Sequence, residues 1–120
     1  MVDIFLSYTE SDREQARRLA ALLESVGWTV WWDRRIPAGE TWRSVLEKAL
    51  ENMRCMVVLW SARSIESEWV YEEASEGRRL GKLVPVLIEA VRPPAGFREI
   101  QAADLSGWGG SREHDGLRML

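Results

Sequence analysis

With 120 residues, the chain is long enough for one domain with a buried core and too short for two. Its formal net charge of −3 gives no reason to expect general binding to nucleic acid or to an anionic membrane. One cysteine and one histidine exclude an intramolecular disulfide, a histidine-rich metal site and a Ser-His-Asp triad in the apolar body. We expect no bound metal. Because the chain shows no basic leader and no apolar run of membrane-spanning length, we expect a cytoplasmic protein.

Strand-like and helix-like patterns alternate along the chain. Short apolar or β-prone runs predict five strands, over residues 2–7, 28–32, 55–60, 83–88 and 103–105. Amphipathic repeats near 3.6 residues predict three helices between them, beginning near Ser11, Thr41 and Ser64. Ser11 and Glu14 have the spacing of a capping box, and glycines are expected to end the first helix at Gly27 and the third over residues 77–81.

This alternation predicts an α/β fold with a parallel sheet covered by helices on both faces. For five strands of this size we expect a flavodoxin-like three-layer sandwich with strand order 2-1-3-4-5, whose binding crevice opens at the carboxyl ends of the first and third strands. The loops at that crevice are residues 8–10 and 61–67. The last residues, 117–120, look like the start of a further helix, so we expect one domain over residues 1–120, cut from a longer protein that continues at the C-terminus.

The segment that follows the third strand carries an unusual carboxylate. Ser64 and Ser67 are good N-cap residues, so Trp69 and Glu73, four positions apart, lie on one face of the helix. Positions 76 and 77 are Glu and Gly, so the helix offers Glu73 no cation three or four residues on. The topology directs this pair towards the crevice. The alternative is a solvated glutamate on an amphipathic helix with Trp69 in the core.

Three families on this fold differ in their motifs. A response-regulator receiver needs an aspartate at the end of its third strand, where this chain has Leu59-Trp60-Ser61. A flavodoxin needs a phosphate-binding loop after its first strand, which residues 7–12 do not provide, and no Gly-x-Gly-x-x-Gly or Walker motif is present.

The third family fits in four places. Residues 5–8 (Phe-Leu-Ser-Tyr) with Asp12 resemble the first conserved box of Toll/interleukin-1 receptor (TIR) domains. Residues 33–39 (Asp-Arg-Arg-Ile-Pro-Ala-Gly) resemble their second box. Residues 64–73 are similar to the segment that carries the catalytic glutamate in TIR domains that cleave NAD⁺. Residues 104–108 resemble the strand and tryptophan near the C-terminal end of bacterial TIR domains. Four motifs in the right order, spread over residues 2 to about 110, identify the chain as a member of the family, close to the bacterial pattern.

The resemblance implies an NAD⁺ nucleosidase, a hydrolase or cyclase, in which Glu73 is catalytic and NAD⁺ is the substrate rather than a cofactor. It implies that Trp69 walls the site, that Tyr8 and Thr9 line it from the first-strand loop, and that Trp42 stacks on the substrate. It also implies activation by homotypic assembly, in which the second-box loop joins neighbouring subunits. The residues of that interaction loop are Arg34, Arg35, Ile36, Pro37 and Gly39.

Several alternatives stay open at this point. Family members often carry a basic residue where this chain has Thr9, which leaves substrate affinity and the choice between hydrolysis and cyclisation undecided. Tyr8 and Trp42 are equally compatible with packing roles, and Arg34 and Arg35 with solvated charges, subunit contacts or phosphate ligands. The expected setting is bacterial defence or interference with a host. The rival function is a non-catalytic scaffold for contacts between TIR domains.

Overall fold

The computed structural model describes residues 3–32 and 38–106, apart from the side chain of Trp42. A five-stranded parallel sheet forms the centre, in the order β2-β1-β3-β4-β5. The strands are β1 (Ile4–Ser7), β2 (Val30–Trp31), β3 (Cys55–Trp60), β4 (Leu83–Leu87) and β5 (Ala103–Asp104). The helices are α1 (Arg13–Ser25), α2 (Trp42–Asn52) and α3 (Glu68–Arg79), with 3₁₀ turns at Glu10–Asp12 and Ser64–Glu66. The predicted fold class and strand order are confirmed.

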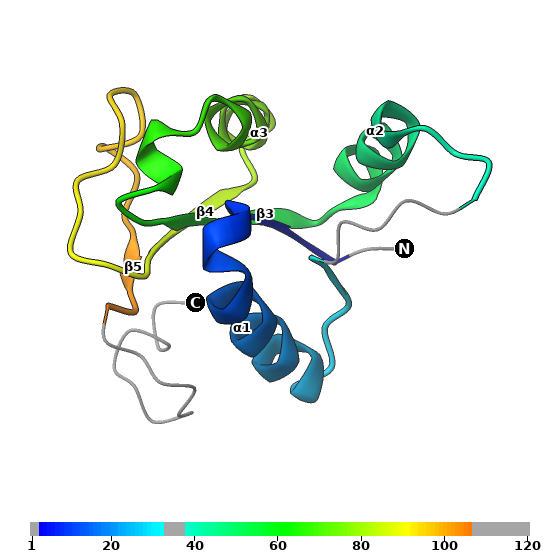
Figure 1. Cartoon of the computed structure of the whole chain (residues 1–120), viewed down its shortest axis with the longest axis horizontal. Coiled ribbons are helices and arrows are strands. Elements are labelled where there is room, and N and C mark those ends of the chain that lie inside the picture. The colour runs from blue at the N-terminus through cyan, green and yellow to red at the C-terminus, as the bar shows by residue number, and fades with distance from the viewer. Residues whose placement is uncertain (1–2, 33–37, 107–120) are drawn as a thin grey trace.

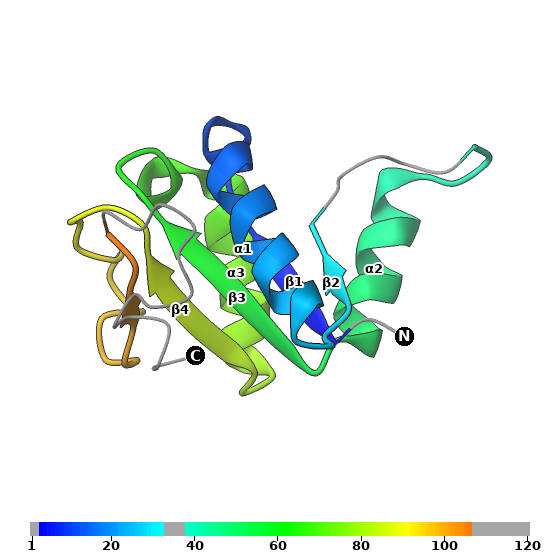
Figure 2. The same cartoon turned by 90° about the horizontal axis from the view of Figure 1, so that it is seen from below.

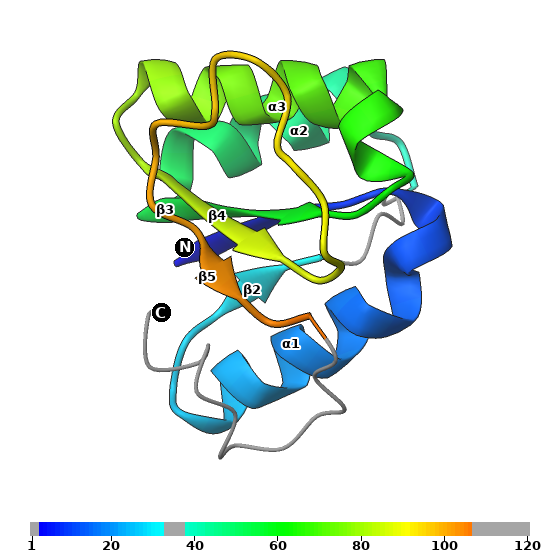
Figure 3. The same cartoon turned by 90° about the vertical axis from the view of Figure 1, so that its left-hand side faces the viewer.

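Helices cover both faces of the sheet. The helix α1 lies on one face, and α2 and α3 lie together on the other, as the side view shows (Figure 3). The view from below shows α1 crossing in front of the strands, with α3 behind them (Figure 2). Only right-handed crossovers connect parallel strands readily, so the reversal of strand order beside β1 sends the first helix and the next two to opposite faces.

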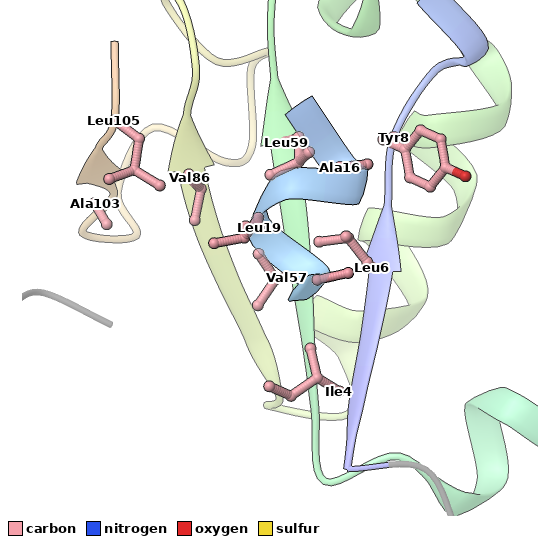
Figure 4. Packing of buried hydrophobic residues seen from close by; sticks show 11 residues of the cluster. Ile4, Leu6, Tyr8, Ala16, Leu19, Val57, Leu59, Val86, Ala103 and Leu105 are labelled. Atoms are coloured by element: carbon pink, nitrogen blue, oxygen red, sulfur yellow. The ribbon is translucent and has the colours of Figure 1, made fainter. Parts of the chain in front are cut away.

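The two faces of β1 separate the core into distinct clusters. Ile4 and Leu6 pack with α1 and with alternate residues of β3, as Figure 4 shows from close by. Phe5 faces the other way, where it joins Met53 and Met56 beneath α2. Successive side chains of a strand point to opposite faces, and both faces are covered here, so β1 is apolar at consecutive positions.

The helix starts confirm two expectations and correct one. Thr41 caps α2 by accepting from Ser44 N at 3.2 Å, and Ser67 caps α3 by accepting from Val70 N at 3.2 Å. The capping box at Ser11 is wrong, since α1 begins at Arg13 after a 3₁₀ turn and its cap makes no side-chain hydrogen bond. Asp12 instead accepts hydrogen bonds from two hydroxyl groups, which fixes the turn before the helix.

The second strand is shorter than expected, whereas α3 ends at Arg79, within the expected 77–81. The second strand pairs only over Val30–Trp31, within the predicted 28–32, because β2 is an edge strand with a single neighbour. Gly77 does not end α3 but lies buried inside it, where a Cβ atom would stand 2.9 Å from Met56 Sδ. This glycine therefore serves the close approach of α3 to the sheet.

Two expected features lie outside the described residues: most of the second-box loop, residues 33–37, and the last helix at 117–120. Figure 1 places the described elements along the chain. None of the helices described within residues 3–32 and 38–106 is long and apolar enough to cross a membrane.

Candidate active site

A carboxylate occupies the buried face of α3. Four buried residues follow the helical repeat i, i+3, i+4 and i+7, and they are Val70, Glu73, Ala74 and Gly77. Three of them are apolar or small, as a helix face packed on a sheet requires. Glu73 is only 4% exposed, in a position where the packing favours an apolar side chain. The solvated glutamate considered from the sequence is therefore excluded.

A residue of the sheet binds the carboxylate of Glu73. Ser7, the last residue of β1, is fully buried, and its hydroxyl donates a hydrogen bond of 2.8 Å to Glu73 Oε1. The two residues are 66 positions apart in the chain, so only the fold brings them together. Buried charged groups need partners of this kind, because burial without them is costly.

A cleft of about 350 Å³ lies between α2 and α3, and Glu73 contributes to its wall. Its other described lining residues are Arg43, Leu46, Glu47, Leu50, Trp69, Glu72 and Glu76. Trp69 is 40% exposed, so its indole borders the cleft and does not belong to the core. The predicted pairing of Trp69 with Glu73 on one side of a cavity is thus present in the structure.

The cleft is acidic, with one cation. Arg79 donates two hydrogen bonds to Glu76, and these bonds lower the pKa of the Glu76 carboxyl below its usual value. Arg43 is the one basic side chain among the described lining residues, and no hydrogen bond or ion pair ties it to another residue in the described part of the chain. The cleft can therefore take a ligand that carries both positive and negative groups.

The described contacts of the first-strand loop lie away from the cleft between α2 and α3. Tyr8 is buried in the core cluster on the α1 face and donates a hydrogen bond to Trp32 O. Figure 4 shows its hydroxyl directed away from the other labelled side chains. Thr9 Oγ1 donates to Asp12 Oδ2 at 2.9 Å. Neither residue lines the cleft between α2 and α3, so their predicted contact with substrate stays a prediction.

Buried hydroxyls also fix the loop after β3. Ser61 Oγ donates to Asp12 Oδ2 at 2.5 Å, which ties this loop to the start of α1. Ser64 Oγ donates to Leu59 O at 2.7 Å and accepts from Ser61 N at 2.7 Å. These contacts hold the turn that leads into α3 and so fix the start of the helix that carries Trp69 and Glu73.

The remaining predicted residues are placed only in part. Trp42 is the first residue of α2, and its side chain lies outside the described part of the structure. Arg34, Arg35, Ile36 and Pro37 also lie outside it. Gly39 is exposed, with a φ of 84° that a glycine adopts without strain.

Sequence reasoning missed two residues of this site. Ser7 stands at a position of β1 that faces α3, and a serine that ends an apolar central strand was the available signal. Arg43 follows the start of α2 and reaches the cleft from the opposite wall. The cleft therefore has a carboxylate and an aromatic plane on the α3 wall, from Glu73 and Trp69, and a guanidinium on the α2 wall, from Arg43. Such groups can bind and polarise a charged ring that is joined to phosphate.

The fold and the cleft together define an α/β domain of flavodoxin-like order, with a tryptophan–glutamate pair on the helix that follows β3. The sequence profile described as "TIR domain" matches residues 4–120. The chain belongs to the TIR domain family.

Two relatives carry names that state an activity. Over 73 residues, 59% of this chain, it is 34% identical to the "NAD(+) hydrolase TcpA" of Theionarchaea archaeon (strain DG-70-1). Over an equal stretch it is 30% identical to the "2' cyclic ADP-D-ribose synthase AbTIR" of Acinetobacter baumannii (strain 1295743). These stretches cover 22% and 27% of the relatives, so the chain spans about a quarter of their length.

Solved structures share the fold. The TIR domain of the Toll-related receptor TRR-2 from Hydra magnipapillata superimposes with a TM-score of 0.77 at 20% identity, covering 87% of this chain and 84% of that one. The TIR domains of the activated Roq1 resistosome, which recognises the pathogen effector XopQ, give a TM-score of 0.63 at 27% identity. That match covers 72% of this chain and 57% of the other.

Proposed function

We propose that this TIR domain cleaves the bond between nicotinamide and ribose in NAD⁺, as a hydrolase or a cyclase, with Glu73 as the catalytic carboxylate. The observation that carries the proposal is a buried glutamate, 4% exposed, in the wall of a 350 Å³ cleft beside an exposed tryptophan. The names of the two relatives support the same substrate.

The chemistry explains why one carboxylate suffices. The nicotinamide of NAD⁺ is already a pyridinium, so when its bond to the ribose carbon breaks, the electron pair moves to the ring nitrogen and neutral nicotinamide leaves. No acid is needed to protonate this leaving group, in contrast to glycosidases with two carboxyl groups. The ribose carbon is left with positive charge, which the Glu73 carboxylate stabilises from a fixed position in a site that limits water.

The second step decides the product. A water molecule that attacks the ribose carbon and loses a proton gives ADP-ribose. A hydroxyl of the same ADP-ribosyl group that attacks there and loses its own proton gives a cyclic product. Both outcomes balance without an oxidant, a metal or a bound cofactor. In this proposal NAD⁺ is the substrate only.

Other residues receive supporting roles. Trp69 offers its exposed indole face to the charged nicotinamide ring. Trp42, the first residue of α2, stacks on the substrate, and Tyr8 and Thr9 contribute from the first-strand loop, as the family resemblance implies. A shift of that loop on substrate binding is required for Tyr8 and Thr9, since neither lines the cleft here.

The test is NAD⁺ consumption by purified protein at high concentration. Nicotinamide release by the wild type and a loss of at least about 100-fold in Glu73→Gln are expected, because the variant keeps the shape but removes the charge that stabilises the transition state. Glu68→Gln, an exposed position on the same helix, is the matched control and keeps wild-type activity.

Thermal unfolding of all three proteins shows that each is folded at the assay temperature. Separation of ADP-ribose from cyclic products identifies the second step. Equal release by Glu73→Gln and wild type would show that another group carries the reaction. No release by the assembled wild type would favour the scaffold function, in which the domain only binds other TIR domains.

We also propose that activity requires self-association. The resemblance implies it through the second-box loop, and TIR domains of the Roq1 resistosome support it, since that structure shows them in an activated assembly. Bacterial defence or interference with a host is the biological setting that we propose for such an enzyme.

A further inference from the structure

We infer that Ser7 is a positioning residue whose hydroxyl holds the carboxylate of Glu73 in the orientation that cleavage of NAD⁺ requires. The inference rests on the proposed function, because it assigns a role within that same site. Ser7 does not line the described cleft and acts only through Glu73.

The position of Ser7 is fixed by the sheet. It ends β1, which pairs with β2 on one side and β3 on the other, and its register partner in β3 is Val58. The Ser7 side chain is fully buried on the face covered by α3. A donor anchored in this way moves less than one on a loop or on the far end of a long side chain.

Glu73 needs such an anchor. The terminal torsion of a glutamate side chain is broad, so packing of the stem leaves the plane of the carboxylate poorly defined. A hydrogen bond of 2.8 Å from Ser7 Oγ to Oε1 selects one orientation of that plane. Stabilisation of a developing cation depends on such orientation being set before the reaction begins.

A purely structural role explains the pair less well. Replacing both partners of a buried hydrogen bond by apolar groups of the same shape is often neutral for stability, and the other buried residues on this face of α3 are Val70, Ala74 and Gly77. Ser64 shows the contrast, since its hydroxyl bonds to main-chain atoms and thereby fixes a turn. Ser7 bonds instead to the one ionisable side chain on the buried face of α3.

The experiment separates kcat from KM in Ser7→Ala. We expect kcat to fall about 10- to 100-fold, the usual effect of removing a group that orients a functional residue, while KM for NAD⁺ changes less than about threefold. Ser25→Ala, which removes a hydroxyl that donates to Leu22 O on α1 and does not line the cleft, is the control and keeps the wild-type kcat per folded molecule. Thermal unfolding gives the folded fraction of each protein.

A second variant guards against loss of fold. Ser7→Cys has nearly the same shape and a weaker donor, so a clear fall in kcat is expected for it at unchanged melting temperature. Wild-type kcat in folded Ser7→Ala together with an inactive Glu73→Gln would overturn the positioning role and leave the proposed function intact. Wild-type activity in Glu73→Gln would overturn both.

Discussion

Two polar residues stand where the packing of this fold favours apolar ones. Glu73 takes a core position on α3, and Ser7 takes a core position at the end of β1. Each is a hydrogen-bond partner of the other, at 2.8 Å between Ser7 Oγ and Glu73 Oε1, and buried polar groups need such partners. Departures from the expected pattern of this kind gather at functional sites, since function and packing make different demands on the same position.

Arg43 supplies a prediction at the same scale. It is the one basic residue among the described residues of an otherwise acidic cleft, and we expect its guanidinium to bind the diphosphate of NAD⁺. Arg43→Ala should raise KM about 10-fold with little change in kcat, because the diphosphate keeps its charge from the ground state to the transition state. Steady-state rates over a range of NAD⁺ concentrations measure both quantities.

Arg63→Ala serves as the control for Arg43→Ala, because Arg63 is exposed and does not line this cleft. A fall in kcat at unchanged KM in Arg43→Ala would assign Arg43 to the reaction step instead. An unchanged KM and kcat would place the diphosphate elsewhere.

Among the elements, α3 lies close to the sheet at Gly77. A Cβ atom at Gly77 would stand 2.9 Å from Met56 Sδ and 3.2 Å from Met56 Cβ, so the helix backbone touches β3 at this point. One turn earlier, the same approach brings Glu73 within hydrogen-bond distance of Ser7. The lack of a side chain at Gly77 and the hydrogen bond of Glu73 to Ser7 thus both depend on the packing of α3 against the sheet.

Gly77→Val tests this contact. The added Cβ atom and its two methyl groups must displace Met56, and we expect a loss of about 1–3 kcal/mol in the free energy of unfolding, as for other overpacked cores. Urea unfolding measures the change. In a Met56→Val background, where the strand side chain is shorter, Gly77→Val should cost less, and the difference is the coupling energy.

An equal cost in both backgrounds would show that Met56 is not the residue that limits the approach of α3. A stabilised Gly77→Val would mean that the gain in helix propensity exceeds the clash. Either result would contradict the view that α3 needs a glycine at position 77 to pack on Met56.

The whole molecule adds the question of assembly. Trp69 in the wall of the cleft is 40% exposed, and the second-box loop that precedes α2 is the segment that the family resemblance implies in subunit contacts. If assembly completes the site, specific activity rises with protein concentration, because the active species is the oligomer.

Measuring nicotinamide release per milligram over a 100-fold range of concentration, with light scattering in parallel, tests this prediction. We expect the specific activity and the mean mass to rise together. A constant specific activity for a protein that stays monomeric would show that one domain is sufficient.

Much of the architecture is local in origin and was predictable. Alternating apolar runs and amphipathic repeats led to a parallel sheet in the order 2-1-3-4-5, since topology rules leave few alternatives for such an alternation. The pairing of Trp69 with Glu73 also follows from spacing along one helix. The prediction of a capping box at Ser11 was wrong, because a 3₁₀ turn forms there instead. That turn is fixed by the hydrogen bond of Asp12 with Ser61, which belongs to a loop distant in the chain.

The sequence by itself determined the class of fold, the helix that carries Glu73 and the family motifs, because each depends on residues close together in the chain. Only the tertiary structure decided that Glu73 is buried, that Ser7 holds it, and that Arg43 faces it across a cleft. Ser7 and Glu73 are 66 residues apart, and no periodicity along a chain specifies a contact at that separation. This contact arises because α3 packs against the end of β1 in the folded protein.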